Sequence, residues 1–151
     1  MTWSAHVVVA VVVEQDGKFL LVEEDIGGSH VLNQPAGHWE TGETLLAAAQ
    51  REALEETGWD VEPTQLLGVY EFKPPDLDYT FLRFAFIAKA LRHHPKRPLD
   101  DGIVRALWLS AEELRRCAIA HRGPAVMRCV DDYLAGQHYP LQMIAHLTHC
   151  A

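Results

Sequence analysis

Cysteine is scarce in this sequence, and the three cysteines form no recognisable pairing or metal-binding pattern. Cys117, Cys129 and Cys150 are odd in number, lie far apart and include no CxxC spacing. This arrangement argues against a disulfide framework and against a zinc site. The sequence therefore predicts a protein of a reducing compartment, and we expect a cytoplasmic location.

Two further scarcities exclude membrane and nucleic-acid roles. The apolar opening segment, residues 5–13, has no positively charged flank and is too short to cross a bilayer, so we expect neither a signal peptide nor a membrane span. Lysine and arginine number 13 against 21 acidic residues, a formal net charge of −8. This charge disfavours nonspecific binding to nucleic acid, and we expect no nucleic-acid or membrane partner.

The distribution of lysine singles out one segment. No lysine occurs between Lys18 and Lys73, yet residues 37–59 (GHWETGETLLAAAQREALEETGW) hold five glutamates. If residues 44–57 are helical, three glutamates stand at i, i+3 and i+4 and share one patch, namely Glu52, Glu55 and Glu56. Two carboxylates about 5 Å apart repel by roughly 3 kcal/mol at an effective dielectric of about 20. A bound cation relieves this repulsion, and ligands that are all oxygen favour Mg²⁺ or Mn²⁺.

The same segment carries a longer spacing signature, G-x5-E-x7-R-E-U-x-E-E-x-G-U, in which U is a bulky apolar residue. It is met at Gly37, Glu43, Arg51, Glu52, Ala53, Glu55, Glu56, Gly58 and Trp59. The signature resembles that of the Nudix hydrolases, with Ala53 smaller than the family usually places there. The segments QPAGHWE, FLRF and GQHYPLQMI extend the resemblance to the NudJ group of Nudix phosphatases over nearly the full chain.

The resemblance implies one Nudix hydrolase domain over residues 1–151, which agrees with a length and a 48% hydrophobic content suited to one core. It also implies an α/β fold, an α/β/α sandwich with a mixed central sheet. Strands are expected at residues 6–13, 18–23, 31–34, 66–72, 79–90 and 103–109, with helices over residues 44–57, from Ser110, and over residues 124–135. The strand over residues 79–90 is apolar on both faces except for Arg83, which predicts a central position.

The resemblance further implies that Glu52, Glu55 and Glu56 are catalytic and bind the metal. A main-chain carbonyl of the preceding loop is a ligand in Nudix proteins, and Gly37 is our candidate, with Ala36 as the alternative. 

The catalytic base is less closely specified. Many Nudix hydrolases recruit an extra acid from the loop before a late strand, which leaves the base open between Glu56, Asp100 and Asp101. We include Asp101 among the catalytic residues.

Other polar residues have two interpretations each. Glu43 and Arg51 are catalytic candidates, but Glu43 lies about two helical turns before Arg51, so a salt bridge that orients the loop explains them equally well. A buried Arg83 requires either a carboxylate, as a structural ion pair, or a substrate phosphate. Trp39, which can stack on a base, and Glu71 complete the substrate-binding candidates.

Three functional hypotheses follow. The first is Mg²⁺-dependent hydrolysis of nucleoside tri- and diphosphates with release of orthophosphate, hydroxymethylpyrimidine diphosphate being a further substrate to test. The second is an ADP-ribose or nucleotide-sugar pyrophosphatase, since Pro74 falls 15 residues after Trp59, where that subgroup carries a marker proline. The third is a Nudix-fold ligand sensor, although sensors usually lose carboxylates that this chain keeps. In each case the partner is a small phosphorylated molecule, and the protein is a monomer or homodimer.

Overall fold

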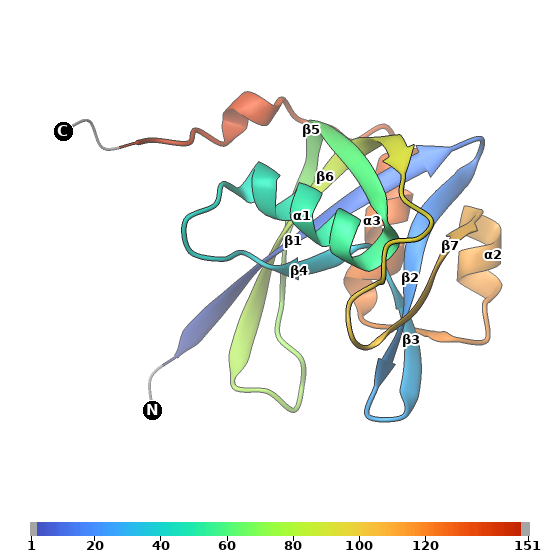
Figure 1. The fold of residues 1–151 in the computed structure, drawn as a ribbon. Helices are drawn as coiled ribbons and strands as arrows, with labels where there is room; N and C mark the ends of the chain where they lie inside the picture. Colours follow the sequence, from blue (N-terminus) through green and yellow to red (C-terminus); the bar gives the residue numbers. More distant parts are fainter. Residues whose placement is uncertain (1–2, 149–151) are drawn as a thin grey trace.

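The β-branched runs of the sequence form a curled mixed sheet with helices on both faces in the computed structural model, which describes residues 3–148 (Figure 1). The elements in chain order are β1 (Ser4–Gln15), β2 (Lys18–Ile26), β3 (Ser29–Asn33), β4 (Ala36–His38), α1 (Leu45–Thr57), β5 (Trp59–Phe72), β6 (Tyr79–His93), β7 (Ile103–Leu109), α2 (Ala111–Arg116), β8 (Ala120–His121), α3 (Pro124–Leu134) and the 3-10 turn η1 (Leu141–Met143).

The sheet runs β5-β6-β1-β2-β3-β8, with β4 paired to β1 and β7 paired to β2. Strand β6 is parallel to β1 and antiparallel to β5, so it is central, as its two apolar faces predict. Strand β1 changes partners along its length. Its middle pairs with the short strand β4, and its end pairs with β2 beyond the Asp16-Gly17 turn.

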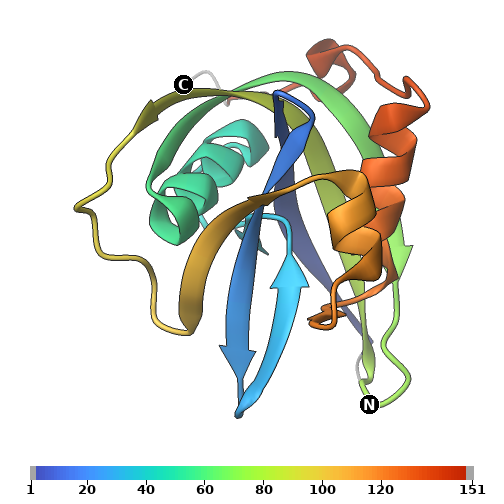
Figure 2. The ribbon, with the colours of Figure 1, turned by 90° about the vertical axis from the view of Figure 1, so that its right-hand side faces the viewer.

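Alternate residues of β1 face two separate layers of the core. Val9, Val11 and Val13 pack with the alanines of α1, whereas Ala10 and Val12 pack with residues of α3. Figure 2 shows α1 on one side of the strands and α2 and α3 on the other, which confirms the sandwich of two helical layers around a mixed sheet. Phe86 of β6 is fully buried in the α1 layer, and burial of a side chain of this size stabilises the fold by roughly 2 to 3 kcal/mol.

Helix α1 has the boundaries that its sequence predicts. The Thr44 hydroxyl accepts a hydrogen bond from the Ala47 N–H, and Gly58 ends the helix with φ of 75°, a conformation that glycine adopts without the steric cost of a Cβ. Strand β5 begins at Trp59 rather than at residue 66, because the chain pairs with β6 through several register shifts. The short elements β4, β8 and η1 were not predicted, since two or three residues carry no periodicity.

No helix within residues 3–148 has the length and apolar character needed to cross a membrane. Cys117 and Cys129 are free thiols, while Cys150 lies outside the described residues.

Candidate active site

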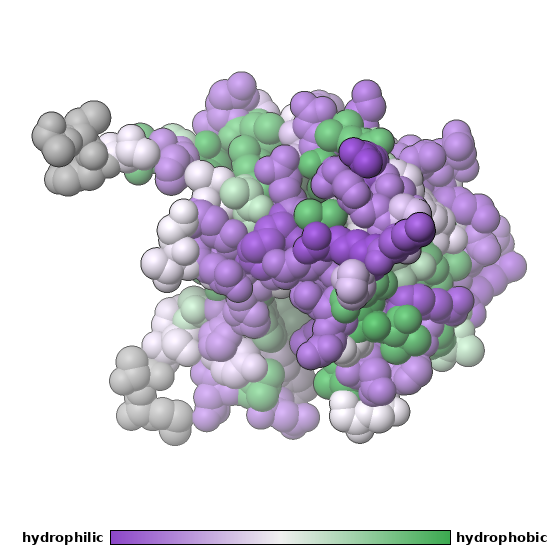
Figure 3. Space-filling model, in the orientation of Figure 1, coloured by the Kyte–Doolittle hydropathy of each residue, from purple (hydrophilic) through white to green (hydrophobic). Residues whose placement is uncertain are grey.

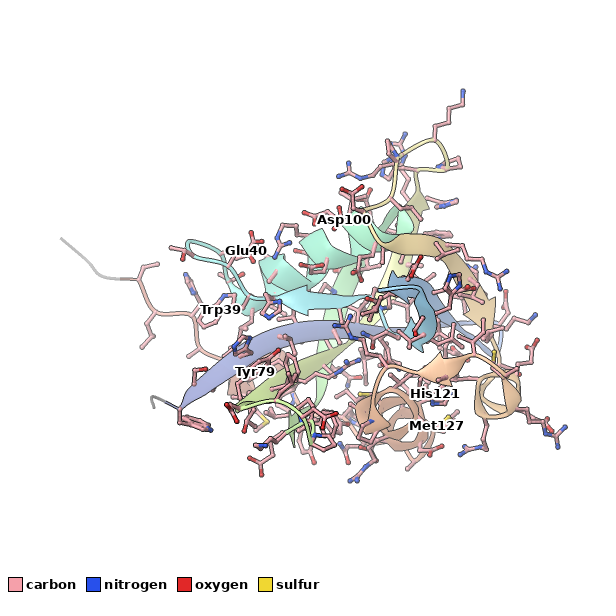
Figure 4. All side chains as sticks on the ribbon, turned by 90° about the horizontal axis from the view of Figure 1, so that it is seen from below. Trp39, Glu40, Tyr79, Asp100, His121 and Met127 are labelled. Atoms are coloured by element: carbon pink, nitrogen blue, oxygen red, sulfur yellow. The ribbon has the colours of Figure 1, made fainter. Side chains whose placement is uncertain are left out.

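Three carboxylates meet at the end of α1. Glu52, Glu55 and Asp100 each place an oxygen within 4.8 Å of the other two. In Figure 4, Asp100 lies beside the ribbon of α1, whereas Trp39 and Glu40 lie toward the other end of that helix. Figure 3 shows hydrophilic side chains gathered across this face of the molecule. The acidic cluster of Glu52, Glu55 and Asp100 therefore joins two segments that are far apart in the sequence.

A main-chain hydrogen bond positions Asp100. Its N–H donates to the carbonyl oxygen of Glu55 at 2.9 Å, one of the last carbonyls of α1, which have no partner within the helix. Asp101 is the next residue, but it sits exposed in the turn closed by Ile103 N–H and Asp100 C=O and is not part of the acidic cluster. The structure thus brings Asp100, and not Asp101, to the site.

Gly37 lies directly against the carboxylate of Glu52. A Cβ at position 37 would stand 2.1 Å from Glu52 Cδ and 2.2 Å from its Oε1, well inside van der Waals contact. Gly37 pairs with Val9, a residue on the α1 side of β1, so Glu52 occupies the space that a side chain at position 37 would need. The glycine of β4 is therefore a condition for placing Glu52 beside the sheet.

The glutamates are less exposed than a solvated helix face. Glu52 and Glu56 are both 8% exposed, so the patch they share is not an open surface of the helix. Strand β4 covers them, and Glu56 Oε1 accepts a hydrogen bond from Ala36 N–H at 2.8 Å. Burial raises the pKa of Glu52 to about 6, although Arg51 acts to lower it. Burial also raises the pKa of Glu56 to about 8, and the nearby charges of Glu52, Glu24 and Asp100 act in the same direction.

The donor set fits a hard divalent cation. Glu52, Glu55 and Asp100 supply oxygens only, as Mg²⁺ and Mn²⁺ prefer. Burying carboxylates beside one another is unfavourable unless positive charge is added. The raised pKa values of Glu52 and Glu56 reflect that cost in the protein alone.

Arg51 ties the preceding loop to the helix. Its Nε and Nη2 donate to the two carboxylate oxygens of Glu43 at 3.0 and 2.7 Å, and Nη2 also donates to the His38 carbonyl at 3.0 Å. Glu43 in turn accepts from Glu40 N–H, and the Trp39 indole donates to the Glu43 carbonyl. The orienting salt bridge considered for Glu43 and Arg51 is present. Arg51 Nη1 also donates to Glu52 at 2.8 Å, so it reaches the acidic cluster.

A pocket of about 580 Å³ opens on the other face of β4. Its walls are largely apolar and include Tyr70, Phe72, Pro74, Tyr79 and Phe81. Gly37 and His38 line one end of it, so the pocket reaches the strand that lies on the acidic cluster. Figure 4 shows Tyr79 on the far side of β1 from α1. The pocket offers an apolar site for an organic group.

Arg83 lies in the wall of this pocket and has no carboxylate partner among the described residues, so the structural ion pair is excluded. Its side chain donates to the amide oxygens of Asn33 at 3.3 Å and Gln34 at 2.6 Å. Its Nε has no hydrogen-bond partner. A buried guanidinium held by neutral amides lacks compensation of its charge, and a ligand in the pocket can supply it.

The other two substrate-binding candidates lie outside the pocket lining. Glu71 is exposed on β5 between Tyr70 and Phe72, which both line the pocket, so strand alternation turns it to the opposite face. Trp39 is 47% exposed and holds the loop through Glu43. Trp59, the residue after Gly58, packs against the core.

Several polar residues near the site were not predicted from the sequence. Arg122 donates to the buried Glu24 at 2.6 Å, and Asn33 and Gln34 hold Arg83. A signal was available for Glu24, because it continues an apolar, otherwise buried strand. None was available for Asn33 and Gln34, since their partner lies about fifty positions away in the chain.

The glutamates of α1 lie against β4, a short strand that contains Gly37, within an α/β/α sandwich. This combination is typical of hydrolases of the Nudix type. A family model described as the NUDIX domain matches residues 4–129, and the chain belongs to that family.

Its relatives include phosphatase NudJ of Escherichia coli strain K12 and of Shigella boydii serotype 4, each 44% identical over 142 residues, which cover 94% of this chain and 92% of the relative. Among solved structures, a NUDIX hydrolase from Nitrosomonas europaea is 46% identical, with a TM-score of 0.92, and covers 95% of this chain and 98% of that one. The chain is therefore an enzyme, a Nudix hydrolase.

Proposed function

We propose that the protein is a Mg²⁺- or Mn²⁺-dependent phosphatase that hydrolyses nucleoside tri- and diphosphates, and a candidate for hydroxymethylpyrimidine diphosphate, with release of orthophosphate. One observation carries this proposal. A single short strand, β4, separates the acidic cluster from one apolar pocket. A substrate with its organic group in the pocket and its phosphates across the end of β4 spans both sites.

The cation would be held by carboxylates of Glu52, Glu55, Glu56 and Asp100, with the Gly37 carbonyl as a further ligand. When bound, it supplies positive charge that offsets the charge of the phosphate oxygens and makes a water molecule more acidic. The residues support this role by their oxygen-only chemistry and by the contact of Gly37 with Glu52.

We assign proton transfer to Asp100. It is the exposed member of the acidic cluster, so bulk water reaches it more readily than the buried Glu52 and Glu56. Its carboxylate takes the proton of the attacking water, and the oxygen of that water attacks phosphorus in line with the leaving phosphate oxygen. Arg51 and Glu43 act as positioning residues, because their salt bridge fixes the loop that carries β4 into α1.

The position of the apolar pocket supports release of orthophosphate. A pyrophosphatase of dinucleotide or ADP-ribose type must hold organic groups on both sides of the diphosphate, whereas the pocket beside β4 lies on one side of the acidic cluster. The terminal phosphate then lies at the acidic cluster. The relatives that match over most of the chain are named phosphatases, which supports the same outcome.

Phosphorus NMR of an early time point with GTP and Mg²⁺ tests this proposal. We expect GDP and orthophosphate in equal amounts, followed by GMP with more orthophosphate. Formation of GMP and pyrophosphate without a GDP intermediate would instead place the enzyme among pyrophosphohydrolases. A cytoplasmic location, the absence of nucleic-acid and membrane partners, and a monomeric or homodimeric state are further parts of the proposal.

A further inference from the structure

Arg83, Asn33 and Gln34 form a polar cluster at the pocket wall. The donors of Arg83 determine how the two amides are oriented. A guanidinium has N–H donors and no acceptor. The amides of Asn33 and Gln34 must therefore turn their oxygens toward it, as the contacts of 3.3 and 2.6 Å show. Arg83 Nε remains without a partner, although the residue is only 9% exposed.

This arrangement directs the amide oxygens of Asn33 and Gln34 at Arg83. Gln34 also donates its amide nitrogen to the Val126 carbonyl of α3 at 2.8 Å, so both ends of its amide are engaged. The amide oxygen of Asn33 accepts from Arg83, so the amide nitrogen of Asn33 remains to donate to a ligand. Arg122, which also lines the pocket, contributes only donors. Beside Arg83, a ligand consequently meets the N–H groups of Arg83, Arg122 and Asn33.

The sheet register shows which part of a substrate reaches Arg83. Tyr70, Arg83, Val8 and His38 are successive partners across β5, β6, β1 and β4. Two strand spacings separate Arg83 from His38, a distance of about 10 Å. The phosphates belong at the acidic cluster on the far side of β4, so the group beside Arg83 is the ring at the opposite end of the substrate.

We propose that Arg83 is a specificity-determining residue that selects the ring of the substrate by its acceptors. Nucleotides that present an oxo group are preferred to those that present an amino group at the same ring position. An exocyclic amine would place a donor against a donor and leave both without a hydrogen-bond partner, whereas a carbonyl oxygen accepts a hydrogen bond from the guanidinium. This inference rests on the proposed function, because it assumes a nucleotide in the pocket.

The test compares ITP with ATP, whose purines carry an oxo and an amino group at position 6. Sites that hydrogen-bond a substrate discriminate strongly against analogues that cannot pair, so kcat/KM for ITP should exceed that for ATP by at least about tenfold. The amide of Arg83→Gln both donates and accepts, so in this variant kcat/KM for ITP should exceed that for ATP by no more than about threefold. Arg116→Gln, which removes an exposed arginine outside the pocket, should keep the wild-type ratio.

Two results would overturn the inference: equal kcat/KM for ITP and ATP in the wild type, or an unchanged preference in Arg83→Gln. If Arg83→Gln does not fold, calorimetric binding of IMP and AMP to the wild-type protein decides. Tighter binding of IMP supports the role of Arg83, and equal or undetectable binding of both contradicts it. If neither triphosphate is hydrolysed while IMP still binds more tightly, the proposed function fails and the preference for oxo groups stands.

Discussion

The main-chain N–H of Asp100 donates to the main-chain carbonyl of Glu55 at 2.9 Å, so the loop before β7 is attached to the last turn of the helix that carries the glutamates of the acidic cluster. The bond does not involve either side chain. Substitution of the Asp100 carboxylate should therefore leave the loop where it is, which allows its chemical role to be separated from its structural one.

Asp100→Asn should lower kcat by at least about a hundredfold, since loss of a positioned proton acceptor typically costs a factor of this size. Asp101→Asn changes the same chemical group one residue further along, outside the acidic cluster, and should retain near-wild-type kcat. Steady-state assays of phosphate release with GTP compare the two. Equal activity of both variants would remove Asp100 from the mechanism, and a selective loss in Asp101→Asn would restore Asp101 as the base.

Glu56→Gln should stabilise the metal-free protein at high pH while abolishing activity. The pKa of Glu56 is raised from 4.5 to about 8, so the folded protein holds this proton more tightly than the unfolded chain, and stability falls as pH rises through that window. Glutamine keeps an acceptor for Ala36 N–H and never ionises. In EDTA, the Tm of the wild type should decrease more than that of the variant between about pH 6 and about pH 9.

Parallel Tm curves for the two proteins would show that ionisation of Glu56 carries no cost in the fold. Addition of Mg²⁺ should reverse the order, because the cation binds the ionised carboxylate of the wild type.

Gly37→Ala should impair the site by displacing Glu52, because the added Cβ would stand 2.1 Å from Glu52 Cδ. We expect kcat to fall at least about tenfold, as misplacement of a catalytic group by about 1 Å is costly. The position has no left-handed φ, so backbone strain does not contribute. Assays over a Mg²⁺ titration should also show a higher metal requirement. Normal kinetics at low Mg²⁺ would mean that Glu52 does not need its present position.

Arg51→Lys should weaken the loop through loss of the paired hydrogen bonds to Glu43, which an ammonium group cannot reproduce. Denaturant unfolding should show a loss of about 1 to 2 kcal/mol, together with a lower kcat. Arg116→Lys alters an exposed arginine that pairs with Glu112 within α2 and serves as the matched control. If both variants behave alike, the Glu43 pair does not position the site.

Local signals explain why α1 was predicted correctly. Thr44 caps its first turn, Gly58 ends it in a left-handed conformation, and the spacing of the glutamates puts them on neighbouring turns. Periodicity shows which residues share a helix face, but it does not show what covers that face. Strand β4 covers Glu52 and Glu56, and a three-residue strand leaves no pattern in the sequence.

The acid that joins the cluster and the partners of Arg83 both depend on contacts between residues distant in the sequence. The sequence left the base open between Glu56, Asp100 and Asp101, and the hydrogen bond that holds Asp100 beside the end of α1 cannot be inferred from spacing. The burial of Arg83 was predicted from its apolar neighbours, but its partners are amides at and just beyond the end of β3 rather than a carboxylate. Glu71 was placed near the substrate, and strand alternation turns it away from the pocket.

The most direct test of the acidic cluster as a metal-dependent catalytic centre is the rate of phosphate release from GTP by wild type and Glu55→Gln at saturating Mg²⁺. Glu55 is half-buried within the cluster, and glutamine preserves its shape while removing its charge. We expect a loss of at least about a hundredfold in kcat with an unchanged circular dichroism spectrum, given the size of charge-stabilising effects in active sites. A folded Glu55→Gln protein that retains near-wild-type kcat would contradict this expectation.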